Sequence, residues 1–156
     1  MLRLWQSMFG SGVLISLLHN PGAVYAQDRL TSSEVVERYR QARTATMQAE
    51  ATEANVSAVA ALLADSVVYE HPRAGARLVG RAAITEGIRS FRGRTRRARV
   101  EILHKIAGPD AVAAEERVTF ETDRDGVWSE VSRTQLSVYE VRNGRISRLI
   151  EYWQPY

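Results

Sequence analysis

The chain predicts an α+β fold in which helices pack on one face of a curved antiparallel sheet. Apolar residues recur at helical spacing through most of residues 31–91, whereas alternating strand patterns with short turns fill residues 99–153. Helices followed by a meander of strands are typical of this class. The 156 residues, 25% charged and 45% hydrophobic, are enough for one domain with a real core.

Local signals justify the individual elements. Thr31 precedes Glu34 by three residues, which is the spacing of a capping box at the start of a helix. Pro72 ends a short β-branched strand, and the pair Asn143 and Gly144 lies between two alternating segments, as in a tight hairpin. The predicted order is helix, helix, strand, helix and four strands, at residues 31–50, 55–64, 67–71, 80–91, 99–108, 111–122, 127–141 and 145–153.

Residues 1–26 have the pattern of a secretory signal peptide. Arg3 precedes an apolar run at residues 8–18, and Val24-Tyr25-Ala26 gives a small-residue cleavage pattern before Gln27. We therefore expect a mature domain at residues 27–156 that is secreted or periplasmic, with no stable membrane insertion after cleavage. The alternatives are a misassigned start codon and a membrane-tethering anchor, although the run is shorter than the roughly 20 residues that span a bilayer.

The cysteine content and the distribution of charge limit which metal sites and which partners the chain can have. The chain has no cysteine, so neither disulfides nor thiolate metal sites are available. Six arginines fall in residues 89–99, which indicates either a solvated loop and strand start or a site that attracts phosphates or an acidic surface. Phe91 is the one aromatic residue among them, and a single-strand nucleic-acid site needs several, so we expect no nucleic-acid partner.

The strand around Arg117 poses a question of side-chain direction. Arg117 and Thr119 share one face of it, and Val118 and Phe120 share the other, because strand residues alternate. We expect the first pair to face a partly polar cavity on the helix side, and the apolar face to lie outside, where another subunit binds. An arginine in a cavity requires an acceptor, and Glu151 on the last strand is the candidate.

The order of elements, together with residues 69–84 (YEHPRAGARLVGRAAI) and 139–153 (YEVRNGRISRLIEYW), resembles the NTF2-like superfamily and its SnoaL-like members. The likeness covers nearly all of residues 31–154. It implies a cone-shaped α+β barrel with a pocket at its open end, commonly dimerising through the outer sheet.

Within that superfamily the pattern is most similar to the limonene-epoxide hydrolase branch. Tyr69 and His71 stand where that branch has a tyrosine and an asparagine that hold a water, and Glu151 stands at its last aspartate. Arg117 and Thr119 stand at its arginine and aspartate. A threonine hydroxyl cannot replace that aspartate as general acid, so the resemblance does not imply epoxide hydrolysis by the same route. No residue matches the aspartate of the superfamily's ketosteroid isomerases and polyketide cyclases either.

The resemblance and the strand directions together imply four catalytic residues. Glu151 or His71 would act as base, while Arg117 and Tyr69 would stabilise negative charge on oxygen. The non-catalytic alternatives are that Arg117 and Glu151 form a structural ion pair and that His71 only lines the cavity as a polar side chain. The residues expected to line the pocket are Tyr39, Thr119 and Trp153.

The function that these expectations favour is an exported SnoaL-like protein acting on a small apolar oxygenated compound. It would be a cofactor-independent isomerase, hydrolase or cyclase, a homodimer, and without a metal site, since His71 and His104 lack the spacing of helical ligands. One alternative is a non-catalytic module of the same fold that binds a small hydrophobic molecule. Another is an interaction protein that acts through the arginines of residues 89–99.

Overall fold

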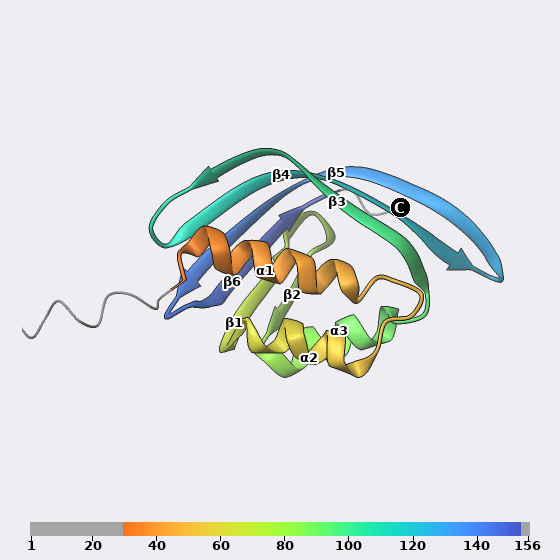
Figure 1. The fold of residues 1–156 in the computed structure, drawn as a ribbon, viewed down its shortest axis with the longest axis horizontal. Helices are drawn as coiled ribbons and strands as arrows, with labels where there is room; N and C mark the ends of the chain where they lie inside the picture. The colour runs from red at the N-terminus through yellow and green to blue at the C-terminus, as the bar shows by residue number, and fades with distance from the viewer. Residues whose placement is uncertain (1–29, 154–156) are drawn as a thin grey trace, which may run out of the picture.

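The computed structural model describes residues 30–153, in which three helices lie on the concave side of a curved six-stranded sheet (Figure 1). The predicted signal peptide, residues 1–26, lies outside the described residues. No helix within residues 30–153 is long and apolar enough to cross a membrane. The elements are α1 (Ser32–Ala45), α2 (Glu53–Ala61), β1 (Leu63–His71), the short 3-10 helix η2 (Pro72–Ala74), β2 (Ala76–Val79), α3 (Arg81–Phe91), β3 (Thr95–Ala107), β4 (Ala111–Arg124), β5 (Val127–Arg142) and β6 (Arg145–Tyr152).

The strands form one open sheet in the order β2-β1-β6-β5-β4-β3. Its neighbours are antiparallel except for β1 and β6, which run parallel. A parallel pair needs a long connection, and here α3 and the whole meander separate the two strands. In Figure 1, β3, β4 and β5 arch over α1, while α2 and α3 lie together near β1. The predicted α+β class is confirmed, but the sheet is mixed instead of antiparallel throughout, and it stays open.

Helix α1 begins as the sequence predicts. The Thr31 hydroxyl accepts a hydrogen bond from the Glu34 backbone N–H at 3.2 Å, and the Glu34 carboxylate accepts one from the Thr31 N–H at 2.8 Å. Val35, Val36 and Tyr39 then point under the sheet and are buried. The helix is thereby held across the concave face, where its buried side helps to form both the core and the site.

The Asn143 and Gly144 hairpin is also confirmed, with φ values of 52° and 71° in the two turn residues. Left-handed backbone at both positions is what a two-residue hairpin requires. This turn sets the register of β5 against β6, in which Ser137 lies opposite Glu151. The β5–β6 register therefore fixes where Glu151 lies along the sheet.

Two features of the sheet were not predicted. Strand β2 pairs with β1 but has only four residues, all of them exposed, so it lacks the alternation that marks a strand. Strand β3 begins at Thr95 rather than Arg99 and contains a bulge, where Arg97 has φ 55° and the register with β4 shifts. The sequence predicts a loop and strand start over these arginines, whereas the bulge accommodates Arg96, Arg97 and Arg99 within the strand.

The main core lies between the helices and the concave face of β1, β5 and β6. Its largest fully buried side chains include those of Leu63, Tyr139 and Ile146. A smaller apolar cluster of Ala98, Val118, Phe120 and Val131 lies toward the far end of the sheet, with Met47 packed against it. The candidate site lies where these two clusters approach the end of β6.

Candidate active site

A cavity of about 460 Å³ opens on the concave side of the sheet, between the end of α1 and the ends of β4 and β6. Its walls include the aromatic residues Tyr69, Phe120 and Trp153, together with charged side chains. This size is in the usual range for small-molecule sites. A larger hollow of about 680 Å³ beside the β5–β6 hairpin is more open and has no aromatic side chain in its wall. The concave cavity is therefore the better candidate site.

Glu151 is the central carboxylate of this cavity. The Tyr69 hydroxyl donates a hydrogen bond to Glu151 Oε2 at 3.0 Å, and Trp153 Nε1 donates to the same oxygen at 3.3 Å. Within residues 30–153 no donor binds the other oxygen, Oε1. The two bonds fix the carboxylate while leaving one oxygen for a ligand.

Tyr69 is held as a hydrogen-bond donor. Burial raises the pKa of its hydroxyl well above the usual range, and the negative charge of Glu151 raises it further. The same two causes, in the same order, raise the pKa of Tyr39, which is buried beside the cavity and packs edge-to-face on Tyr139. Both phenols therefore keep their protons at neutral pH.

Arg133 brings a positive charge into the cavity. Its guanidinium carbon lies 3.9 Å from the centre of the Trp153 ring and 5.7 Å from that of Phe120, which are distances for cation–π contact. Its Nε donates to Gln135 Oε1 at 3.1 Å. Because Trp153 also binds Glu151, the cation and the carboxylate share one aromatic neighbour.

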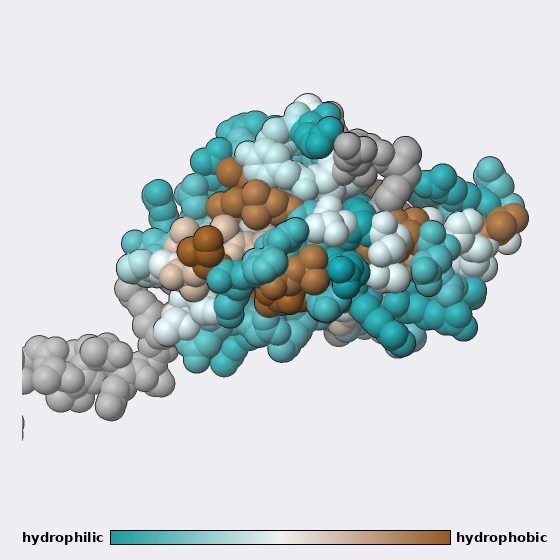
Figure 2. Space-filling view, turned by 90° about the horizontal axis from the view of Figure 1, so that it is seen from above, coloured by the Kyte–Doolittle hydropathy of each residue, from teal (hydrophilic) through white to brown (hydrophobic). Residues whose placement is uncertain are grey.

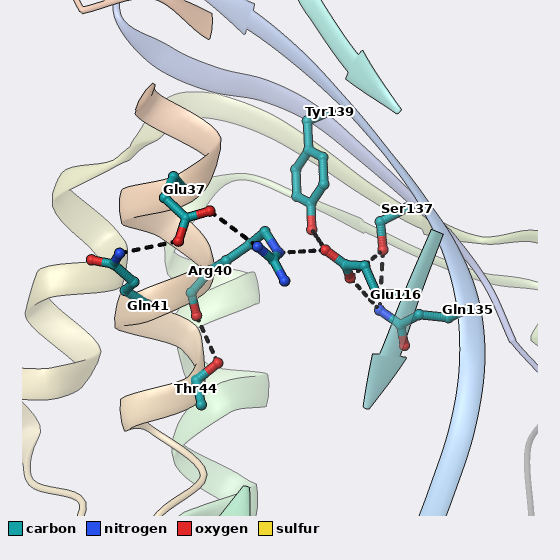
Figure 3. Close-up of polar contacts among 8 residues, drawn as sticks. All are labelled: Glu37, Arg40, Gln41, Thr44, Glu116, Gln135, Ser137 and Tyr139. Atoms are coloured by element: carbon teal, nitrogen blue, oxygen red, sulfur yellow. Dashed lines mark hydrogen bonds and ion pairs between the residues drawn. The ribbon is translucent and has the colours of Figure 1, made fainter. Parts of the chain in front are cut away.

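A buried ion pair lies deeper, between α1 and β4 (Figure 3). Arg40 Nε donates to Glu116 Oε1 at 2.5 Å, and Glu116 is only 2% exposed. Ser137 Oγ and Gln135 Nε2 each donate to Glu116 Oε2 at 3.1 Å, and the Tyr139 hydroxyl lies 3.4 Å from Oε1. Burial, followed by the Glu116 charge, raises the pKa of Tyr139. Four donors thus satisfy this carboxylate.

Gln135 connects the buried pair to the cavity. Its amide nitrogen donates to Glu116, and its amide oxygen accepts the bond from Arg133. The orientation of Gln135 is therefore set on one side by a carboxylate that only accepts and on the other by a guanidinium that only donates. In this way the ion pair under α1 orients the cation of the cavity.

His71 has a different environment from the one expected. It is 1% exposed, and its Nδ1 accepts a hydrogen bond from the Ala74 backbone N–H at 2.9 Å. This bond assigns the proton of the neutral ring to Nε2, which has no hydrogen-bond partner among the described residues. The ring packs edge-to-face on Trp153, 4.1 Å between centres, and forms no hydrogen bond with Glu151 in that part of the chain.

The structure contradicts the expected placement of Arg117 and Thr119. Arg117 is 50% exposed and pairs with Glu101 at 2.8 Å, and Thr119 lies 3.4 Å from Ser132 across the outer face. The expected pairing of Arg117 with Glu151 is therefore wrong. The physical reason is that the apolar residues on the opposite face of β4 are needed inside, against the helices, and not on the outer surface.

Sequence reasoning missed Glu116 and Arg133 for the same reason. Glu116 shares its face of β4 with Val118 and Phe120, which are buried. An acid in an otherwise apolar set is a signal of a buried, paired carboxylate. The sequence contains that signal, but the prediction placed this face of β4 on the outer surface of the sheet. Its partner Arg40 was beyond reach, since 76 positions separate the two residues.

The arginines of residues 89–99 are largely paired. Two of the six bind Glu53, and two others bind Glu121, which the bulge in β3 allows adjacent arginines to share. Arg94 differs, because it lines the cavity and forms no ion pair within the described residues. The four paired arginines are Arg89, Arg92, Arg96 and Arg97. Because these four arginines form ion pairs with nearby carboxylates, we interpret most of residues 89–99 as a solvated stretch and not as a site for acidic partners.

Within residues 30–153, no three His, Asp or Glu side chains lie close enough together to hold a metal ion. The cavity instead presents carboxylate, guanidinium, hydroxyl and indole groups, and its wall includes Tyr69, Phe91, Phe120 and Trp153. Such groups suit proton transfer and charge stabilisation on an organic ligand. The fold and this site define a cone-like α+β domain with a pocket on the concave side of its sheet.

Residues 36–149 match the model of the SnoaL-like domain family, and the chain belongs to that family. The predicted resemblance to NTF2-like and SnoaL-like proteins is confirmed. The comparison with curated proteins finds no match.

Solved structures give the same fold at low sequence identity. A candidate SnoaL-like polyketide cyclase from Shewanella putrefaciens is 12% identical, with TM-score 0.67, over 78% of this chain and 88% of that one. An LEH-like epoxide hydrolase from M. tuberculosis is 24% identical, with TM-score 0.60, over 77% and 83%. A candidate ketosteroid isomerase from Kribbella flavida is 20% identical, with TM-score 0.58, over 78% and 76%.

Proposed function

We propose that the protein is a cofactor-independent acid–base catalyst of the isomerase or cyclase type, which acts on a small apolar ketone in the concave cavity. The observation that supports this most is the environment of Glu151. One of its oxygens is fixed by Tyr69 and Trp153, and the other is left for a ligand. The family's solved relatives, which include a candidate cyclase and a candidate ketosteroid isomerase, agree with this class of reaction.

The proposed step is proton transfer at a carbon next to a carbonyl. Glu151 Oε1 takes the proton, and the electron pair of the C–H bond moves to the carbonyl oxygen to give an enolate. Arg133 supplies the positive charge that stabilises this oxygen. Glu151 then returns the proton to the same or another carbon of the ligand, so that no external acid or oxidant is consumed.

The structure changes the roles of two expected residues within this proposal. Tyr69 orients the base instead of binding the ligand oxygen, since its single proton goes to Glu151. His71 packs edge-to-face against Trp153. It does not act as the base in this proposal, because its Nδ1 already accepts a hydrogen bond from the Ala74 backbone N–H. Epoxide hydrolysis is disfavoured, because Thr119 lies outside the cavity and Glu116 is paired with Arg40.

Proton exchange provides the test. A panel of cyclic ketones in D₂O is followed by proton NMR with and without the protein. We expect at least one ketone to exchange its α-protons faster with native than with heat-denatured protein. Ketones that bind, as shown by a raised melting temperature, but never exchange would contradict catalysis and would favour a binding module of the same fold.

We also propose that the protein is a homodimer formed through the outer face of its sheet. Figure 2 shows this face from above, with apolar side chains gathered in patches among polar ones. Leu136 and Tyr152 are register partners there and are 43% and 41% exposed. Neighbouring exposed apolar side chains of this size are typical of an interface. The superfamily resemblance points to the same face.

Leu136→Glu is expected to convert the dimer to a monomer, because it places a charge in the apolar interface. Analytical ultracentrifugation measures the change. Val79→Glu is the matched control, since Val79 is 53% exposed on β2, at the far edge of the sheet. A wild-type protein that is monomeric at all concentrations, or a Leu136→Glu variant that stays dimeric, would contradict the proposal.

Export through residues 1–26 remains our proposal for localisation, based on the apolar run and the cleavage pattern before Gln27. Mass spectrometry of the protein recovered from the periplasm or medium of a bacterial host is expected to give an amino terminus at Gln27. An intact chain starting at Met1 and retained inside the cell would contradict it.

A further inference from the structure

A second, smaller hollow adjoins the concave cavity at Glu151, and we call it the side pocket. Its volume is about 140 Å³. Four residues line both the side pocket and the larger cavity, so the two hollows adjoin at the proposed base. The shared residues are Arg43, Tyr69, Phe91 and Glu151. The reaction proposed above uses the larger hollow and leaves the side pocket without a role.

The walls that belong to the side pocket alone are mainly apolar. Ile84 and Ile88 of α3 are buried there. Leu78 on β2 is the register partner of Tyr69 on β1, so an apolar side chain lies beside the phenol that orients Glu151. In another protein, an apolar cavity of about 150 Å³ binds benzene. The side pocket therefore has the size and the lining for an alkyl or phenyl group of about four to six carbons.

Gly87, in the middle of α3, keeps the side pocket open. Glycine is unfavourable inside a helix, and the backbone does not require it here, since the φ of Gly87 is not positive. Apart from its chain neighbours and the α3 backbone, a Cβ at this position would meet one described atom within 4 Å. That atom is Leu78 Cδ1 at 3.9 Å, an ordinary van der Waals contact. The space that a side chain would take at position 87 is therefore part of the side pocket.

We propose that the natural substrate is a ketone branched at its reacting carbon, with a ring body in the concave cavity and an apolar substituent of about four to six carbons in the side pocket. Glu151 lies where the two hollows adjoin, so a carbon held against it has room for a group in each. Gly87 then determines how large the substituent can be. This inference rests on the proposed function of the cavity and adds the substrate class.

Matched ketones test the branching. 1-Tetralone has no substituent, 2-butyl-1-tetralone has a butyl group on its α-carbon, and 6-butyl-1-tetralone has the same group at the far end of the ring body. Isothermal titration calorimetry measures the binding of each. We expect 2-butyl-1-tetralone to bind at least about tenfold more tightly than 1-tetralone, since each buried CH₂ strengthens binding about fourfold. A 2-butyl ketone that binds no more tightly than 1-tetralone would overturn the inference.

Variants locate the butyl group. Gly87→Leu fills the side pocket and is expected to weaken binding of the 2-butyl ketone at least about tenfold, and binding of the other two less than about twofold. Gly87→Ala adds one methyl group, suits the helix, and should weaken binding of the 2-butyl ketone about threefold, so the test does not depend on the folding of the leucine variant.

Ala82→Leu is the matched control for these variants. Ala82 is exposed on α3 and does not line the side pocket, so its replacement should leave the binding of all three ketones unchanged. An equal loss of binding for all three ketones in the Gly87 variants would overturn the role of the side pocket. Unchanged binding of 2-butyl-1-tetralone in those variants would overturn it as well.

The outcomes separate this inference from the proposed function. Binding does not require proton transfer, so the effect of Gly87→Leu should persist in a protein that also carries Glu151→Gln. If the protein exchanges the α-protons of 1-tetralone but Gly87→Leu affects all three ketones equally, the substrate class alone is overturned. If Gly87→Leu weakens only the 2-butyl ketone but no ketone exchanges its α-protons, the catalytic proposal alone is overturned.

Discussion

Glu151→Gln is expected to lower the rate of ketone α-proton exchange by about two to four orders of magnitude, the range that a positioned general base contributes. The amide can still accept the bonds from Tyr69 and Trp153, so the shape of the cavity is kept. What it cannot do is take a proton from carbon. The measurement is the NMR exchange rate at saturating ketone, which removes differences in binding.

The control for this variant is Glu101→Gln. Glu101 is also a carboxylate on the sheet, but it is 62% exposed and pairs with Arg117 on the outer face. Its replacement should leave the exchange rate unchanged. A Glu151→Gln protein that binds the ketone and exchanges it at the wild-type rate would show that another group is the base.

Arg40→Met is expected to lower the free energy of unfolding by about 3–5 kcal/mol, the typical cost of leaving one member of a buried ion pair alone. Methionine fills much of the space of the arginine stem but provides no donor to Glu116. The carboxylate then stays buried at the α1–β4 contact without its countercharge. Urea unfolding followed by tryptophan fluorescence measures the loss.

Two further variants test whether the loss of stability comes from the unpaired buried charge of Glu116. Arg40→Met/Glu116→Gln removes both charges and keeps a side chain that can bond Gln135 and Ser137, so it should recover much of the lost stability. Arg117→Met breaks an ion pair that is exposed on both sides and should cost far less. If Arg40→Met and Arg117→Met destabilise the protein equally, the ion pair under α1 does not have the role assigned to it.

The parts of the fold that depend on local signals could be predicted from the sequence. Thr31 and Glu34 are close in the chain and form their capping box wherever the helix packs. The Asn143 and Gly144 turn likewise depends on the backbone preferences of two adjacent residues. Helix α2 begins slightly earlier than predicted, because Thr52 is its cap.

The site was predictable only in part. Tyr69, Glu151 and Trp153 do converge, since β1 and β6 are neighbours and the family pattern placed them on one wall. The face of β4 was assigned wrongly, because alternation says which residues share a face and not which face is inside. Choosing the face requires knowing where α1 lies, and that is a property of the whole fold.

The same limit applies to Arg133. On β5 it lies between the buried residues Val131 and Gln135, and an arginine in such a set gives no indication of its partner. Its orientation depends on Gln135, on Trp153 from another strand and, through Glu116, on α1. Long-range contacts of this kind leave no local pattern in a single sequence.

A crystal structure of Glu151→Gln with the fastest-exchanging ketone would show where the chemistry takes place. We expect the ketone in the concave cavity, with its α-carbon against position 151 and its carbonyl oxygen within hydrogen-bond distance of Arg133. A ketone bound on the outer face of the sheet, or one in the cavity with its α-carbon turned away from position 151, would contradict the assignment of Glu151 as the base.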